Sequence, residues 1–154
     1  MRNPGRRILV FVVAYDAERH IRGVFERIPP ELFRDENVQF VCIDDASRDQ
    51  GPAVLVDWIH ERGISNVTVL RNPVNQGYGG NQKLGYRFAI ERGFDFVILL
   101  HGDGQYAPER LPDFIEAWER TGADVVLGSR MLEPGGAQRG GMPLYKRIGN
   151  QVLS

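Results

Sequence analysis

Two groups of acidic residues stand where apolar segments of the sequence end. Asp44 and Asp45 follow the apolar run VQFVCI, and Asp103 follows FVILL within the stretch LLHGDGQYAPE. Adjacent carboxylates repel each other, so the pair at 44 and 45 favours a site where a ligand or a metal ion relieves the repulsion. Asp103 lies between two glycines, which let a ligand approach the backbone, and hard divalent cations prefer oxygen ligands. The sequence therefore predicts binding chemistry at both places.

The same acids also have structural interpretations. A cap for the next helix needs only one of Asp44 and Asp45, and Ser47 or Asp49 could provide that cap, so binding is favoured at the pair. Asp16, which follows the first apolar run, is as good a helix cap as a ligand-binding residue.

The stretch around Asp103 leaves similar alternatives open. Asp103 alone could be a turn residue, but its flanking glycines favour a metal site. His101 could be a metal ligand, a hydrogen-bond donor or an ordinary histidine at a strand end, and the residue types do not decide between these roles.

The elements that must position these residues alternate between strand and helix. Apolar runs without strict alternation, typical of strands covered on both faces, predict strands at residues 8–14, 38–43, 67–70, 94–100 and 124–128. Helical spacing of apolar residues predicts helices at residues 17–28, 52–62, 81–92 and 108–120. This alternation predicts an α/β fold of three layers with a mainly parallel sheet.

In open parallel sheets the ligand lies beyond the carboxyl ends of the strands, so we expect the polar residues that follow the strands to share one crevice. The segment NPVNQGYGGNQ, residues 72–82, is rich in glycine and precedes a predicted helix. Gln82 excludes both the dinucleotide-binding G-x-G-x-x-G pattern and a P-loop. The segment could still let the backbone lie close to a ligand.

Composition narrows the class of protein. The 154 residues suffice for one domain, and the net charge of −1 argues against nucleic acid as a partner. Cys42 is the single cysteine, which excludes an internal disulfide and favours a reducing compartment. No stretch reaches the about 18 apolar residues of a membrane-spanning helix. Residues 144–154 begin an amphipathic helix with Lys146 and Arg147, which suits either an anionic bilayer surface or packing on the sheet.

Five segments in order resemble the motifs of family 2 glycosyltransferases with the GT-A fold. VVAYDAE resembles PAYNE, CIDDASRD resembles VDDGSTD, and LLHGDGQYAPERLP resembles the D-A-D-x-Q-x-x-P segment with its D-x-D metal motif. NPVNQGYGGNQKLGYRFA resembles N-x-G-x-G-x-A-x-x-x-G-x-x-x-A, and VLGSR resembles the GSR of the dolichol-phosphate mannosyltransferase-like branch. This resemblance over residues 7–130 implies metal-dependent, inverting transfer of a sugar from a UDP- or GDP-linked donor to a polyprenyl- or dolichyl-phosphate acceptor.

The resemblance also implies roles for individual residues. The donor nucleotide would lie against Ala14, Tyr15, Asp16, Asp44, Asp45, Arg71, Gly77 and Gly80. Mg²⁺ or Mn²⁺ would bind Asp103, and also His101, which stands where the family has the first acid of D-x-D. Catalysis would use Asp103, Gln105 and Arg130, the last two close to the sugar, the diphosphate or the acceptor. On this basis we expect Asp44→Ala to weaken nucleotide binding without lowering the melting temperature of the ligand-free protein.

Three departures from the family's motifs leave a second function open. Asp16 replaces an asparagine, Ala46 a glycine and His101 an acid, so the chain could be a GT-A domain that binds a nucleotide sugar with little or no transfer. Nucleotidyltransferases and dinucleotide-dependent oxidoreductases are disfavoured because their glycine motifs near the N-terminus are missing. We expect one GT-A domain over residues 1–154, truncated at its C-terminus. It would be cytoplasmic, peripheral at the inner face of a membrane with its lipid-phosphate acceptor, and capable of self-association.

Overall fold

The computed structural model describes residues 5–129. Its strands are β1 (Ile8–Ala14), β2 (Val38–Asp44), β3 (Val67–Arg71) and β4 (Phe96–His101). Its α-helices are α1 (Ile21–Glu26), α2 (Gly51–Arg62), α3 (Gly77–Glu91) and α4 (Leu111–Thr121), and its short 3₁₀ helices are η1 (Pro30–Phe33) and η2 (Pro108–Arg110). Within this part of the chain no helix is long and apolar enough to cross a membrane.

All four strands are parallel and form one sheet in the order β3-β2-β1-β4. β1 is an inner strand of the sheet. Its Ile8 pairs with Val38 of β2 on one side and with Phe96 of β4 on the other. The chain therefore adds β2 and β3 on one side of β1 and returns to the other side for β4. Ligands of open α/β sheets bind where the strand order reverses in this way, so the topology directs attention to the carboxyl ends of β1 and β4.

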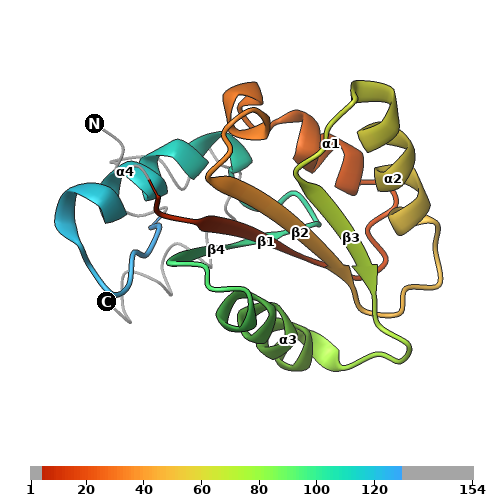
Figure 1. Ribbon diagram of the computed structural model, residues 1–154. Coiled ribbons are helices and arrows are strands. Elements are labelled where there is room, and N and C mark those ends of the chain that lie inside the picture. The colour runs from red at the N-terminus through yellow and green to blue at the C-terminus, as the bar shows by residue number, and fades with distance from the viewer. Residues whose placement is uncertain (1–4, 130–154) are drawn as a thin grey trace, which may run out of the picture.

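Helices cover both faces of the sheet and make three layers (Figure 1). The apolar faces of α1, α2 and α4 pack on one face, where Phe25, Trp58 and Ile115 join the strand residues Val10 and Phe40 in one buried cluster. The other face is covered by α3, with a smaller cluster of strand residues. Every residue of β1 is buried, as expected for a strand with neighbours on both edges and helices on both faces.

α3 lies unusually close to the sheet at Gly85. A Cβ at this position would be 2.0 Å from the Phe11 ring of β1, whereas a Cβ at Gly79 of the same helix would meet nothing within 4 Å. Phe11 is fully buried, and covering such a side chain contributes about 2–3 kcal/mol. The missing side chain of Gly85 is what lets the helix backbone cover that ring.

Four predicted elements begin two or more residues from the expected position. α1 starts at Ile21 rather than at residue 17, because the preceding turn is held to a neighbouring loop: the Glu18 N–H donates to Asp49 Oδ2 at 2.8 Å. β4 starts at Phe96 because Phe94 lies in the turn that closes the end of α3, where it donates its N–H to Ala89 O at 3.0 Å. α3 starts at Gly77, so the glycine-rich segment is partly the first turn of the helix. In the last of them residues 108–110 form the 3₁₀ helix η2, and α4 starts at Leu111.

The predicted fifth strand at residues 124–128 is wrong for the described part of the chain. These residues form no strand there, and Val125 and Leu127 are 71% and 83% exposed. Gly128 lies against α4 instead, where an added Cβ would be 2.6 Å from the Phe114 ring. An apolar run becomes a strand only when a neighbouring strand shares backbone hydrogen bonds with it, and no described strand does so here.

Candidate functional site

Backbone hydrogen bonds join the carboxyl ends of β1, β2 and β4 into one rim. Gly102 after β4 donates its N–H to Val13 O at 2.9 Å, and Asp45 after β2 donates to Ala14 O at 2.9 Å. Gly102 lies so close to β1 that a Cβ there would be 3.2 Å from Ala14 Cβ. The fold therefore brings together the strand ends at which the sequence predicted a site.

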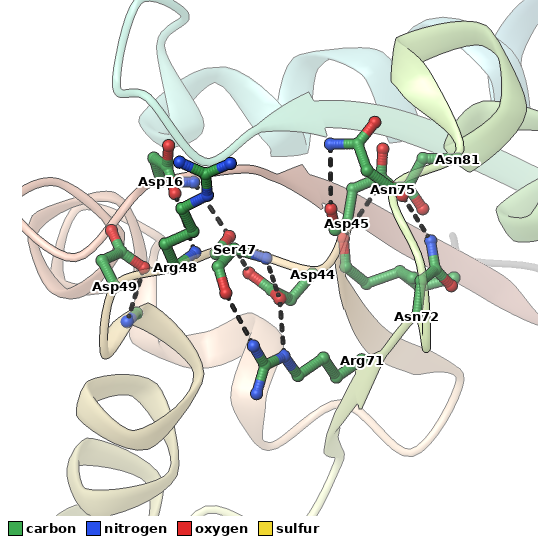
Figure 2. A network of polar contacts seen from close by, with 12 residues as sticks. Asp16, Asp44, Asp45, Ser47, Arg48, Asp49, Arg71, Asn72, Asn75 and Asn81 are labelled. Atoms are coloured by element: carbon green, nitrogen blue, oxygen red, sulfur yellow. Dashed lines mark hydrogen bonds and ion pairs between the residues drawn. The ribbon is translucent and has the colours of Figure 1, made fainter.

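Asp44 at the end of β2 is 2% exposed, and protein donors engage both of its carboxylate oxygens. Oδ2 accepts the Ser47 N–H at 3.0 Å, and Oδ1 accepts the Ser47 hydroxyl. Arg71 of β3 places Nε 3.4 Å from Oδ2 and donates from Nη2 to Ser47 O at 2.6 Å (Figure 2). The Asn72 N–H also donates to Asp44 O at 2.8 Å. Asp44 thus shapes the turn after β2 and orients an arginine beside it.

Asp45 is equally buried but serves a different segment. Its Oδ1 accepts Asn72 Nδ2 at 2.7 Å and the Gln76 N–H at 2.8 Å, while its backbone oxygen accepts Asn75 Nδ2 at 3.1 Å (Figure 2). Asp45 therefore holds the segment between β3 and α3. The charge repulsion predicted from the adjacent acids is relieved by donors of the protein itself rather than requiring a ligand.

The loops after β1 and β2 are locked to each other by reciprocal hydrogen bonds. Ser47 Oγ accepts the Asp16 N–H at 2.9 Å, and in return Asp16 Oδ1 accepts the Arg48 N–H at 3.1 Å. Asp49 Oδ2 accepts the Glu18 N–H at 2.8 Å, and the Glu18 carboxylate accepts at 3.0 Å from the N-cap residue of α2. Asp16 is therefore a cross-loop acceptor and not the cap of the helix that follows it.

Two residues of these loops have left-handed backbone conformations, with φ of 47° for Asp16 and 59° for Ala46. Aspartate visits this region with little penalty, but a residue such as alanine loses about 1–2 kcal/mol there. Ala46 stands where the resembling family has glycine, and the geometry gives the physical reason for glycine at that position. The locked loops hold Ala46 in the strained conformation.

A cleft of about 560 Å³ opens beside this network, between the start of α2 and the end of β3. Such a volume is typical of small-molecule sites. Arg71, whose side chain is 59% exposed, contacts Asp44 and also forms part of the wall of the cleft. The lining residues are Ala46, Ser47, Arg48, Asp49, Gln50, Pro52, Ala53, Arg71 and Pro73.

The end of β4 is built from aromatic side chains instead of buried acids. His101 Nε2 lies 3.0 Å from the hydroxyl of Tyr78, in the first turn of α3. The Tyr106 ring packs edge-on against the imidazole with centroids 4.7 Å apart. Burial lowers the pKa of His101, opposed by the charge of Asp103. Burial also raises the pKa of Tyr78, with Tyr106, Tyr86 and Asp103 adding to the effect.

Asp103 is exposed and sits in a turn that leaves part of its carboxylate available. Its Oδ1 accepts the Gln105 N–H at 3.0 Å, and Gly104 between them has a φ of 76°, which favours glycine. Oδ2 accepts no hydrogen bond from the described residues. No group of three or more His, Cys, Asp or Glu in residues 5–129 could hold a metal ion alone. One free carboxylate oxygen fits a divalent cation whose other ligands come from phosphates and water.

The predicted site residues divide into two sets on this rim. Ala14, Asp16, Asp44, Asp45 and Arg71 belong to one connected network, whereas His101, Asp103 and Gln105 follow β4. Tyr15 is 52% exposed between the two sets. Gly77 and Gly80 lie in the first turn of α3, joined to the β4 end through Tyr78. Arg130 lies outside the described residues.

Sequence reasoning missed two residues that hold α3 to the rim. Asn81 is 2% exposed and donates from Nδ2 to Ile43 O at 2.9 Å, and Tyr78 contacts His101. Asn81 stands where the family's motif has alanine. A polar residue at this usually apolar position could have indicated a buried hydrogen bond. A tyrosine in a glycine-rich segment gives no such signal.

The comparisons with known proteins agree with this architecture. The sequence profile described as "Glycosyl transferase family 2" matches residues 9–150. The chain belongs to glycosyl transferase family 2, and its fold is the GT-A fold, which confirms the predicted α/β class with a parallel sheet.

Curated relatives confirm the resemblance to dolichol-phosphate mannosyltransferase-like proteins. An undecaprenyl-phosphate mannosyltransferase of Micrococcus luteus is 42% identical over 98 residues, covering 62% of this chain and 37% of the relative. A polyprenol monophosphomannose synthase of Mycolicibacterium smegmatis is 28% identical over 136 residues, covering 88% of this chain and 49% of the relative. The chain thus spans less than half the length of either protein.

Among solved structures, glucosyl-3-phosphoglycerate synthase from Mycobacterium tuberculosis shares the fold with a TM-score of 0.56 at 20% identity. The match covers 75% of this chain and 40% of that one. That structure is a complex with Mn²⁺, UDP and glucosyl-3-phosphoglycerate.

Proposed function

We propose that this chain binds the nucleotide-sugar donor of a metal-dependent, inverting glycosyltransferase that acts on a polyprenyl-phosphate-type acceptor. The observation that carries the proposal is the rim itself. An open cleft with an exposed arginine follows β2 and β3, and an available carboxylate follows β4, both on one edge of a GT-A sheet. Because β2 and β4 are separated by β1 alone, their ends are about 10 Å apart, comparable to the reach of a nucleoside diphosphate.

The nucleoside would occupy the cleft. Arg71 is held by Asp44 and Ser47 O and offers the rest of its guanidinium to the base or ribose. Tyr15 is exposed next to the network and offers a ring for stacking. In this proposal Asp44 and Asp45 act on the nucleotide mainly by holding Arg71 and the segment before α3.

The diphosphate would lie towards Asp103. This residue would hold Mg²⁺ or Mn²⁺ together with the donor phosphates, and Gly77 and Gly80 would let the backbone of α3 approach them. When bound, the cation would neutralise the charge that develops on the departing diphosphate. Mn²⁺ in the solved structure of similar fold and the donor chemistry of Asp103 both support a divalent cation of this class.

Sugar transfer would proceed by attack opposite the diphosphate, which inverts the anomeric centre. The names of the Micrococcus and Mycolicibacterium relatives support a lipid-phosphate acceptor and a mannosyl group. A phosphate monoester is largely ionised near neutral pH, because its second pKa is about 6, so this acceptor needs no general base. Gln105 and Arg130 would orient the sugar, the diphosphate or the acceptor. The protein would work at the inner face of a membrane, without nucleic acid, and could self-associate.

The alternative proposal is a GT-A domain that binds the nucleotide sugar with little or no transfer. The observation favouring it is that His101, in place of the family's first acid, contacts Tyr78 rather than facing an open position. Donor hydrolysis and transfer to a polyprenyl phosphate distinguish the two proposals, because only the first predicts turnover.

Calorimetry with UDP and GDP, each with and without Mn²⁺, tests the shared core of both proposals. We expect binding of one nucleotide that depends on Mn²⁺, and about a tenfold to hundredfold loss of affinity in Asp103→Asn, because one charge-assisted interaction is removed. Asp113→Asn, an exposed acid on α4, is the control and should bind normally. Equal affinity of Asp103→Asn and the parent protein would reduce Asp103 to a turn residue.

A further inference from the structure

We propose that His101 is a positioning residue that holds the first turn of α3 to β4 through Tyr78, and that it is not a metal ligand. The inference rests on the proposed function, because the segment held in this way is the one proposed to meet the donor phosphates. It assigns a different role to the position where the family has an acid.

The contacts of the imidazole carry this assignment. Nε2 is 3.0 Å from the Tyr78 hydroxyl, so this nitrogen is engaged by the protein. The Tyr78 and His101 rings are tilted with their centroids 5.3 Å apart, and the Tyr106 ring also packs edge-on against the imidazole. The imidazole is therefore fixed between two tyrosines, and its Nε2 contacts the Tyr78 hydroxyl instead of presenting a lone pair to an ion.

The position of Tyr78 in the fold shows what the contact does. On the side of β2, the start of α3 is anchored by Asn81, which donates to Ile43 O, and by the Gln76 N–H on Asp45. On the side of β4, the Tyr78–His101 contact provides the corresponding anchor among the described residues. Glycines at 77, 79 and 80 make this turn intrinsically easy to deform, so anchors on both sides are needed to fix its backbone.

Hydrogen exchange of the ligand-free protein tests the anchor directly. The N–H groups of residues 81–83 close the first turn of α3, because helical N–H groups donate to the carbonyl four residues earlier. We expect them to exchange about three- to tenfold faster in Tyr78→Phe and in His101→Phe, the loss of one hydrogen bond. Tyr86→Phe, on the same helix, is the control and should exchange like the parent protein. Unchanged exchange in both test variants would overturn the proposal.

Nucleotide binding then separates positioning from metal ligation. Each single variant should weaken Mn²⁺-dependent nucleotide binding by about three- to tenfold, and the double variant should be no weaker than either, because both remove the same contact. The Mn²⁺ concentration for half-maximal binding should change less than about twofold in His101→Phe. A tenfold higher Mn²⁺ requirement in His101→Phe, with Tyr78→Phe unaffected, would identify a metal ligand instead. If the parent protein binds neither nucleotide, the proposed function fails while the exchange experiment still decides the anchor.

Discussion

The acidic side chains at the ends of β1 and β2 differ from the one after β4 in their burial and in their hydrogen bonds. Asp44 and Asp45 are almost completely buried, and each accepts two or more hydrogen bonds from neighbouring segments. Asp103 is exposed and accepts one hydrogen bond inside its own turn. We call the first region, with Asp16 and Ser47, the closed half of the rim, and the turn at residues 103–105 the open half.

This difference separates acids that determine shape from acids that are available to a ligand. In the closed half, the carboxylates are acceptors for backbone and side-chain donors, so removing one leaves buried donors unsatisfied. In the open half, a carboxylate oxygen faces solvent, and removing that carboxylate leaves no buried donor unsatisfied. A binding role can therefore be assigned to an acid at a strand end only when its hydrogen-bond partners are known.

The largest expected contrast between the halves is chemical accessibility. Cys42 lies in β2, two residues before Asp44 of the closed half, and burial, with the Asp44 charge adding, raises its pKa to about 12. We expect a disulfide reagent at pH 8 to label Cys42 at least about a thousandfold more slowly than the thiol of Gln105→Cys, because Cys42 reacts only through unfolding. Comparable labelling rates would show that the closed half opens readily.

The same thiol gives a pH dependence with a definite sign. In the unfolded chain Cys42 ionises near its ordinary value of 9.0, and in the folded protein near 12. The folded state therefore holds its proton longer, and this contribution to stability is complete below pH 9 and is lost as the pH rises from 9 towards 12. Urea unfolding of the parent protein and Cys42→Ala across this range should show a smaller decline in the variant.

A smaller contrast is expected for the acids themselves. Asp44→Ala should lower the free energy of unfolding by about 3 kcal/mol, because the Ser47 donors and Arg71 lose their acceptor, whereas Asp103→Asn should change it by less than about 0.5 kcal/mol. This revises the expectation from the sequence that the ligand-free protein tolerates Asp44→Ala. Chemical denaturation of both variants measures the difference, and equal stabilities would remove the distinction between the halves.

The smallest effect is expected from relieving strain in the closed half. Ala46→Gly should stabilise the protein by at most about 1 kcal/mol, since the left-handed penalty is removed but the unfolded chain gains freedom. Ala53→Gly, inside α2, provides the matched control and should destabilise by about 1 kcal/mol. A loss of stability in Ala46→Gly would contradict the strained backbone at that position.

The fold was largely predictable because its signals are repeated and local. Apolar runs located four strands within two residues, and helical spacing with the stops at Gly63 and Gly122 located the ends of α2 and α4. Residues 124–128 were misassigned because pairing is a tertiary property that an apolar pattern does not contain. α1 was overestimated because the contact of Glu18 with a distant loop prevails over helix propensity.

The convergence of the candidate residues on one rim was predictable, but the contacts among them were not. Strand ends could be placed on one rim from topology alone, yet the sequence does not show that Asp45 faces Asn72 or that His101 faces Tyr78. Those contacts depend on the directions of side chains and on the positions of loops, where a shift of a few ångströms would change the partner. Asp44 and Asp103 were therefore both expected to contact a ligand, as a nucleotide-binding residue and as a metal-binding residue, although only Asp103 is exposed.

The pairing of β1 with β4 also governs when the domain can form. Ile8 pairs with Phe96, so β1 waits during synthesis for roughly ninety further residues before its second edge is covered by β4. Parallel pairings between distant segments form slowly, and an apolar strand with an open edge is prone to aggregate in the meantime. The speed of synthesis and the access of chaperones between β1 and β4 therefore bear on the yield of folded protein.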